Sequence, residues 1–158
     1  MLHENKKKNL FDVLSSKIKK NISSSQSFYV VNNLTKKKVP KVPFSDIKNY
    51  VLGARYKLGL IFVGDTLSKR LNNTYRGKPK VANILSFPYS KKDGEIFIHL
   101  GKTEKEAGKF DHTYTQHLTF LLIHGLLHLK GMNHSAKMES EEQRILKQFL
   151  FEQKSKKK

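Results

Sequence analysis

The sequence predicts one α/β (α+β) domain in which a small mixed four-stranded sheet packs with about five helices. Segments of strand and helix character alternate from residue 27 to residue 152, as expected for sheet and helix layers. The run from Leu118 to Leu129 is apolar on every side, which predicts a helix buried on all sides. A chain of 158 residues is long enough for one hydrophobic core and short appendages.

Four apolar, β-rich segments predict the strands: residues 27–31, 58–64, 83–88 and 95–100. The second segment, LGLIFVG, is the strongest strand candidate. Pro88 is expected to stop the third strand, because proline has no N–H to donate to a sheet ladder. The Lys-Lys-Asp-Gly stretch before the fourth strand predicts a turn.

Five further segments favour helices: residues 41–57, a segment following residue 64, about 102–109, 115–130 and about 136–152. Short polar side chains at a helix start satisfy its free N–H groups. We therefore expect Ser45 or Asp46 near the cap of the first helix, and Asp65 or Thr66 at the cap of the second.

The two ends of the chain are basic and set the predicted domain limits. We expect a basic N-terminal extension at residues 1–25, a folded domain at residues 26–153 and a basic C-terminal tail at residues 154–158. Leu10, Leu14 and Ile18 could form the apolar stripe of a short docked helix. The Lys- and Ser-rich composition instead favours a solvated, poorly ordered extension.

The net charge of +18, from 31 Lys and Arg against 13 Asp and Glu, predicts a polyanionic partner. Nucleic acid is favoured, with an anionic membrane surface as the competitor. Only four of the 31 basic residues are arginines, so compositional drift toward lysine also explains part of the excess. The absence of cysteine excludes disulfides and thiolate sites, so any transition-metal site uses His, Asp or Glu.

No segment with the character of a targeting signal or membrane anchor stands out. The charged start, MLHENKKKNLF, is not followed by an apolar signal-peptide stretch. The most apolar run, residues 118–129, is too short to span a bilayer. We therefore expect a soluble, cytoplasmic protein that makes no membrane contact, and the lack of cysteine fits that compartment.

The segment HGLLHLKGMNH, residues 124–134, predicts a metal site. His124 and His128 are four residues apart, so on a helix their imidazoles project from one face, one turn apart. Gly131 can adopt the left-handed conformation that reverses a chain after a helix, which would swing His134 toward the same ion. Three neutral imidazoles leave a fourth position for water, as in catalytic zinc sites.

The alternative is that these are ordinary core or surface histidines. Unpaired polar groups buried in an apolar helix cost about 1–3 kcal/mol each, so a shared cation is the favoured interpretation. His117 is expected to be a neighbour of the site or a helix-end residue. His112 and His99 are expected to be ordinary polar residues.

The histidine spacing and Gly131 match the metzincin peptidase pattern H-E-x-x-H-x-x-G-x-x-H at every position but one. Gly125 stands where those peptidases carry their general base, Glu. Glycine inside a helix costs about 1 kcal/mol relative to alanine, so Gly125 indicates close approach of another backbone or of substrate.

A phosphodiester substrate fits better than a peptide, because its transition state needs positive charge more than a carboxylate base. The segment LNNTYRGKPKVANILSFP carries Arg76, Lys78 and Lys80 in a loop before a strand. Arg76 could hold a phosphate in bidentate fashion. A solvated basic turn is the slightly favoured interpretation of that loop's composition alone.

These segments resemble one known family. HGLLHLKGMNH is similar to the HGxLHLxGYDH motif of the YbeY family of bacterial endoribonucleases, and LNNTYRGKPKVANILSFP resembles its LNxxYRxKxxPTNVLSFP segment. GEIFIHLG resembles the family's GDIxI strand, and MESEEQ resembles the acidic start of its last helix. The likeness covers about residues 28–152.

The resemblance implies that His124, His128 and His134 hold one Zn²⁺ per chain on a central helix. It implies catalytic roles for Arg76 and for His124, which holds the metal whose water attacks the phosphodiester. It further implies a single-strand-specific endoribonuclease that matures the 3′ end of small-subunit (16S) ribosomal RNA and serves ribosome quality control. The partners would be single-stranded RNA, ribosomal RNA and the small ribosomal subunit, and the chain is expected to be a monomer.

Three departures from the family pattern bear on these expectations. Asn133 replaces the Asp before the third histidine, which removes a charge near the metal. Ala82 replaces a Thr. The basic N-terminal extension lies outside the pattern, and extra affinity for RNA or the ribosome is its expected role.

Two other functions remain open at this point. A non-enzymatic, zinc-stabilised ribosome-assembly factor would explain the charge and the missing general base. A metallopeptidase would explain the histidine spacing, but Gly125 argues against it.

Overall fold

The computed structural model describes residues 28–155, with side chains through residue 150. Predictions for residues 1–27 and 156–158, including the possible helical stripe of the N-terminal extension, lie outside the described residues. Within the described part, no helix combines the length and apolar character needed to cross a membrane.

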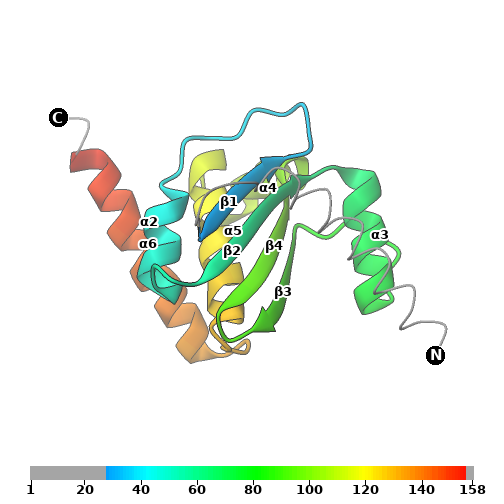
Figure 1. Ribbon diagram of the computed structural model, residues 1–158. Helices are drawn as coiled ribbons and strands as arrows, with labels where there is room; N and C mark the ends of the chain where they lie inside the picture. The colour runs from blue at the N-terminus through cyan, green and yellow to red at the C-terminus, as the bar shows by residue number, and fades with distance from the viewer. Residues whose placement is uncertain (1–27, 156–158) are drawn as a thin grey trace.

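Four strands form one mixed sheet, as predicted (Figure 1). They are β1 (Tyr29–Asn33), β2 (Lys57–Val63), β3 (Ile84–Ser90) and β4 (Asp93–His99). The order across the sheet is β1-β2-β4-β3. β2 pairs in parallel with both of its neighbours, and β3 forms an antiparallel edge hairpin with β4 through a turn at the predicted place.

Five α-helices pack with the sheet, which confirms the predicted fold class (Figure 1). They are α2 (Phe44–Leu52), α3 (Asp65–Arg76), α4 (Leu100–Ala107), α5 (Tyr114–Leu129) and α6 (Ala136–Ser155). A short 3-10 turn at Gly108–Phe110 links α4 to α5. α2 is shorter than predicted, because it starts after Pro43 and ends at Gly53, whose φ of 89° is left-handed.

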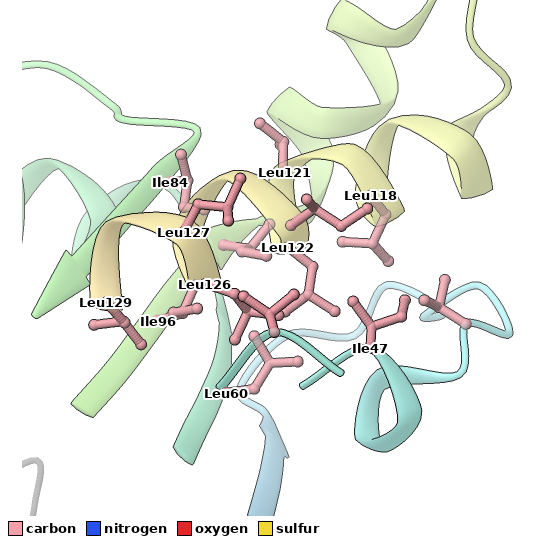
Figure 2. Packing of buried hydrophobic residues seen from close by; sticks show 14 of the residues in the cluster. Ile47, Leu60, Ile84, Ile96, Leu118, Leu121, Leu122, Leu126, Leu127 and Leu129 are labelled. Carbon is pink, nitrogen blue, oxygen red and sulfur yellow. The ribbon is translucent and has the colours of Figure 1, made fainter. Parts of the chain in front are cut away.

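The sheet carries an apolar core on each face, and α5 lies over the larger one (Figure 2). Side chains alternate along β2: Leu60 and Phe62 join the cluster under α5, whereas Ile61 packs with Leu71 of α3 on the other face. Because α5 contacts α2, α4, α6, β3 and β4, it is the central helix of the domain.

β3 continues through Pro88 instead of stopping there, so that prediction is wrong. β3 is an edge strand, and its register with β4 shifts between Pro88 and Ser90. An edge strand tolerates proline because one side of its backbone has no partner strand to which an N–H must donate.

The predicted side-chain cap of α3 is also wrong, whereas Ser45 and Asp46 lie in the first turn of α2, near its cap as expected. Pro43 and Gly64 occupy the N-cap positions, and neither makes a side-chain cap bond. Asp65 instead pairs with His99 at the end of β4, with 2.5 Å between Asp65 Oδ1 and His99 Nε2. Asp65 therefore contacts His99, a residue distant in sequence, and does not cap the backbone of its own helix.

Candidate metal centre

The turn after α5 carries the chain back toward the helix face that holds His124 and His128. Gly131 has a φ of 101°, the left-handed conformation anticipated from the sequence. The Gly131 N–H donates to the His128 carbonyl, and the Met132 N–H donates to the Leu127 carbonyl, both at 3.0 Å. These two bonds are those of a Schellman motif.

This turn brings the three predicted histidines into one cluster. One nitrogen from each of His124, His128 and His134 lies within 4.8 Å of the other two. The ring centroid of His128 lies 4.6 Å from the ring centroids of His124 and of His134, and these two centroids are 5.2 Å apart. The three imidazoles therefore converge, as ligands of a single ion must.

Hydrogen bonds fix the orientation of two of the rings. His124 Nδ1 lies 2.5 Å from Oε1 of Glu142, and His128 Nδ1 lies 3.0 Å from the carbonyl oxygen of Met132. Because a carboxylate and a carbonyl only accept, each Nδ1 donates a proton, which leaves the Nε2 atom of a neutral ring with a lone pair for a metal ion. The two Nε2 atoms face each other at 3.0 Å.

Two lone pairs at that separation repel unless an electrophile lies between or beside them. A divalent ion bound by three neutral imidazoles meets this requirement, and zinc takes such nitrogen donors readily. The Glu142 carboxylate and the Met132 carbonyl are the outer partners that metal-bound histidines usually have. The residues present thus fit a zinc-type ion.

His124 and His128 lie on a stripe of α5 that is not fully buried. Phe120, His124 and His128 are half-buried, whereas most of the helix around them is buried. The sequence-based expectation of burial on every side is therefore wrong along this stripe, which leaves the cluster open to solvent. Burial, followed by the nearby His124, lowers the pKa of His128, so its imidazole is held neutral and ready to bind metal.

Glu142 is the residue of the candidate site that sequence reasoning missed. It lies on α6 among the buried residues Met138, Ile145 and Leu146, and is itself only 5% exposed. A glutamate on the apolar stripe of an amphipathic helix was the available signal, because a buried carboxylate needs a partner. That partner is His124.

Replacing Glu142 with Gln should weaken zinc binding by about 10- to 100-fold, the usual cost of losing an outer carboxylate. Glutamine retains the size and an accepting oxygen but removes the charge that raises the basicity of His124. Competition titration with a chromogenic chelator measures the change. Glu141→Gln is the matched control, because Glu141 pairs with Arg144 on the same helix. Equal affinities for both variants would contradict the role of Glu142.

Arg76 lies on the wall of a hollow that contains the histidines. This hollow has a volume of about 480 Å³ and is lined by Arg76, Asn83, Ile84, Ser86, Pro88, His124, His128, Gly131, Met132, Asn133 and His134. Arg76 is the last residue of α3, and its side chain is exposed. Four predicted site residues, Arg76 and the three histidines, thus line one hollow.

Two buried side chains of α3 hold the loop that follows Arg76. Ser68 Oγ donates to the Ala82 carbonyl at 2.8 Å and accepts from the Ala82 N–H at 3.0 Å. Asn72 Nδ2 donates to the Lys80 carbonyl at 2.8 Å. These bonds tie the loop to the helix through its backbone, so the alanine at position 82 leaves this link intact.

Gly125 does sit at a close approach, but the neighbours are side chains of the sheet. A Cβ atom at this position would lie 2.9 Å from Ile84 Cδ1, and 3.0 Å from both Ile96 Cδ1 and Ser86 Oγ. The expectation of an approaching backbone or substrate is therefore wrong. Because this position faces β3 and β4, it has no room for the glutamate of a peptidase.

The remaining described histidines lie outside the cluster of three. His99 caps α4, since its Nδ1 accepts from the Lys102 N–H at 2.9 Å. His117 is buried, and its Nδ1 lies 3.2 Å from Nδ1 of His112. Burial lowers the pKa values of both His112 and His117.

Asn133 lines the hollow but is not among the outer partners found for His124 and His128. Within the described residues, the charge that pairs with a clustered histidine comes from Glu142. Although Asn133 stands where the family pattern has Asp, the cluster therefore still has one carboxylate in contact with it, that of Glu142.

Comparisons with known proteins agree with this geometry. The family model described as "Endoribonuclease YbeY" matches residues 17–153. The "Endoribonuclease YbeY" of Thermodesulfovibrio yellowstonii is 41% identical over 102 residues, which cover 56% of this chain and 64% of that protein. The protein of the same name from Allorhizobium ampelinum is 38% identical over 95 residues, which cover 54% of this chain and 57% of that protein. The aligned part thus spans less than two thirds of these relatives.

A solved structure shares the fold. The solution structure of TM1509 from Thermotoga maritima gives a TM-score of 0.59 at 23% identity, covering 80% of this chain and 93% of that one. The family match includes all three clustered histidines, Arg76 and Glu142. Because that match extends over most of the sequence, the chain belongs to the YbeY family.

Proposed function

We propose that this protein is a metal-dependent endoribonuclease that cleaves single-stranded RNA. The observation that carries the proposal is the shared hollow, which is lined by three converging imidazoles and an exposed arginine. A metal site beside a cation suits the hydrolysis of an anionic phosphodiester. The family name and the net charge of +18 support the choice of RNA.

Each residue has a definite task in this proposal. His124, His128 and His134 would hold one zinc ion, and Glu142 would orient His124 through its Nδ1–H. Held there, the ion would supply Lewis acidity, which lowers the pKa of water toward neutral pH. Arg76 binds the phosphate through paired N–H donors and stabilises the charge that develops on its oxygens.

The biological substrate proposed is the 3′ end of small-subunit (16S) ribosomal RNA, with a further role in ribosome quality control. The small ribosomal subunit would be the partner and the cytoplasm the location. The family resemblance supports these assignments, and the basic surface suits a ribosomal RNA substrate. The chain is proposed to act as a monomer.

A cleavage assay on labelled single-stranded RNA tests the proposal. Wild-type protein should cut the RNA, lose activity with chelator and recover it with added zinc. Arg76→Ala should lower the rate by roughly 100-fold and reduce the slope of log affinity against log salt by about 0.7. Arg70→Ala, on the same helix but outside the lining of the hollow, should leave the rate near wild type.

The same assay separates the competing assembly-factor function. A structural metal predicts that chelation unfolds the domain and that no RNA is cut under any condition. Cleavage that is equal with and without chelator would contradict the proposed enzyme. Circular dichroism of the chelated protein, recorded in parallel, shows which of these outcomes is due to unfolding.

A further inference from the structure

An exposed aromatic ring lies beside the metal centre without a role in the chemistry described above. We propose that Phe110, backed by Phe120, is a stacking platform for one unpaired nucleobase of the RNA. This inference rests on the proposed function and adds to it a subsite that selects single strands.

Phe110 presents one packed face and one open face. Its ring stacks on the buried His117, with centroids 4.8 Å apart and an interplanar angle of 27°. Its side chain nevertheless remains 52% exposed. Large aromatic side chains normally bury most of their surface, so a ring held flat against a buried neighbour with half its surface in solvent is suited to stacking a flat ligand.

The platform is held in a fixed position by its backbone. Phe110 ends the 3-10 turn, and the next residue, Asp111, has a left-handed φ of 54°, which is uncommon for a residue other than glycine. The Asp111 N–H donates to the Gly108 carbonyl at 3.3 Å, and the His112 N–H donates to the Ala107 carbonyl at 3.0 Å.

The layer beneath the platform is also fixed. His117 Nδ1 lies 3.2 Å from His112 Nδ1, and His117 Nε2 lies 3.8 Å from a carboxylate oxygen of Glu106. The two Nδ1 atoms share a hydrogen bond, and the Glu106 carboxylate lies on the side of the other ring nitrogen of His117. Asn83 Nδ2 in turn donates to Glu106 at 3.0 Å, which links this layer to the edge of the metal hollow.

The platform and the metal centre lie in two hollows that share lining residues. A hollow of about 630 Å³ contains Phe110, Phe120, His124 and His134, and the hollow with Arg76 shares His124 and His134 with it. From Phe110 to Phe120, and from Phe120 to His124, the ring centroids are each 6.2 Å apart. A strand that runs from the hollow with Arg76 into the hollow with Phe110 can therefore place one of its bases on Phe110.

The chemistry of the hollow around Phe110 favours an unpaired base as the ligand. Proteins recognise single-stranded RNA by stacking splayed bases on aromatic rings, whereas the bases of a duplex are already stacked on each other. The lining also includes the polar side chains of Ser135, Glu139 and Gln143, which suit the polar edge of a base. An aliphatic ligand would gain nothing from the flat ring or from these groups.

The test measures the affinity of wild type and variants for a series of uncleavable 2′-O-methyl RNAs. In each RNA of the series, a different nucleotide lacks its base. Stacking contributes about 1–3 kcal/mol per base, which corresponds to roughly 5- to 150-fold in affinity. At one position, loss of the base should weaken wild-type binding by that factor. In Phe110→Ala the same loss should have no further effect, while the salt slope stays at the wild-type value.

Three variants distinguish stacking from a merely structural role. Phe110→Trp should bind at least as tightly as wild type, and Phe110→Leu, which keeps an apolar cover over His117, should still lose the base effect. Phe28→Ala is the matched control, because Phe28 is also exposed and lines a different hollow. Thermal unfolding of each variant identifies any loss caused by misfolding.

The two proposals fail in different ways. Suppose that wild-type protein cleaves RNA, and that each abasic position weakens binding to Phe110→Ala by the same factor as binding to wild type. The stacking platform is then refuted and the endoribonuclease stands. A uniform loss of affinity across all strands also refutes it. If wild-type protein neither binds nor cleaves RNA, both proposals fall together.

Discussion

Replacing His128 with alanine should abolish stoichiometric zinc binding and reduce RNA cleavage to the level of the chelated protein. The loss of a direct ligand should exceed the roughly 100-fold that loss of an outer partner costs. It also removes one of the two facing Nε2 atoms and the hydrogen bond to the Met132 carbonyl. Metal analysis after gel filtration and a cleavage assay measure the two effects.

The same variant should lose the stabilisation that zinc gives to the wild type. At a free zinc concentration 100 times the dissociation constant, binding stabilises the folded state by about 2.7 kcal/mol. For a domain of this size that is roughly 5–10 °C in the unfolding midpoint. Calorimetry with and without zinc should show this shift in the wild type and not in His128→Ala.

The matched control is His99→Asn. His99 is a buried histidine outside the cluster, and asparagine can replace it as the N-cap of α4. This variant should bind one zinc ion per chain like the wild type. If His128→Ala also bound one ion with unchanged affinity, the three-histidine site would be wrong.

Gly125→Glu should unfold the domain and should not create a peptidase. The added Cβ alone would lie within 3.0 Å of Ile84 and Ile96, and overpacking of this kind costs about 1–3 kcal/mol. The carboxylate beyond it would be buried against apolar strands, at a cost of several kcal/mol more. Together these costs approach the 5–15 kcal/mol by which a typical domain is stable.

Gly125→Ala isolates the steric part of this effect. Its overpacking cost is offset by about 1 kcal/mol of improved helix propensity, so the net loss should be about 0–2 kcal/mol. Urea unfolding of both variants, followed by circular dichroism, gives the comparison. A stable Gly125→Glu protein that cleaves casein would refute this packing argument and revive the peptidase interpretation.

The central helix, the strands and the histidine cluster could be predicted because their signals are local. The four-residue spacing of His124 and His128 defines a helix face, and Gly131 marks the reversal that follows. Periodicity and apolar runs likewise located the four strands and five α-helices of residues 28–155. Each of these features depends on residues within one or two turns of each other.

The features that the sequence did not predict depend on the tertiary arrangement. Pro88 is compatible with a strand only because β3 is at the sheet edge, and strand order is not written in local sequence. Asp65 pairs with His99 across the sheet end instead of capping its own helix. Glu142 contacts His124 only because α6 folds back onto α5, so its role became visible with the packing of the two helices.

The Schellman turn at Gly131 has a consequence for how the site assembles. All three imidazoles come from residues 124–134, so bringing them together closes only a short loop, and the entropy lost is small. Glu142 and Arg76 are more distant in sequence, and their arrival requires α6 and α3 to dock. We therefore expect ion capture to be an early, local event in folding, with the phosphate-facing wall completed last. Folding with and without zinc, followed by stopped-flow, would reveal this as a change in folding rate rather than unfolding rate.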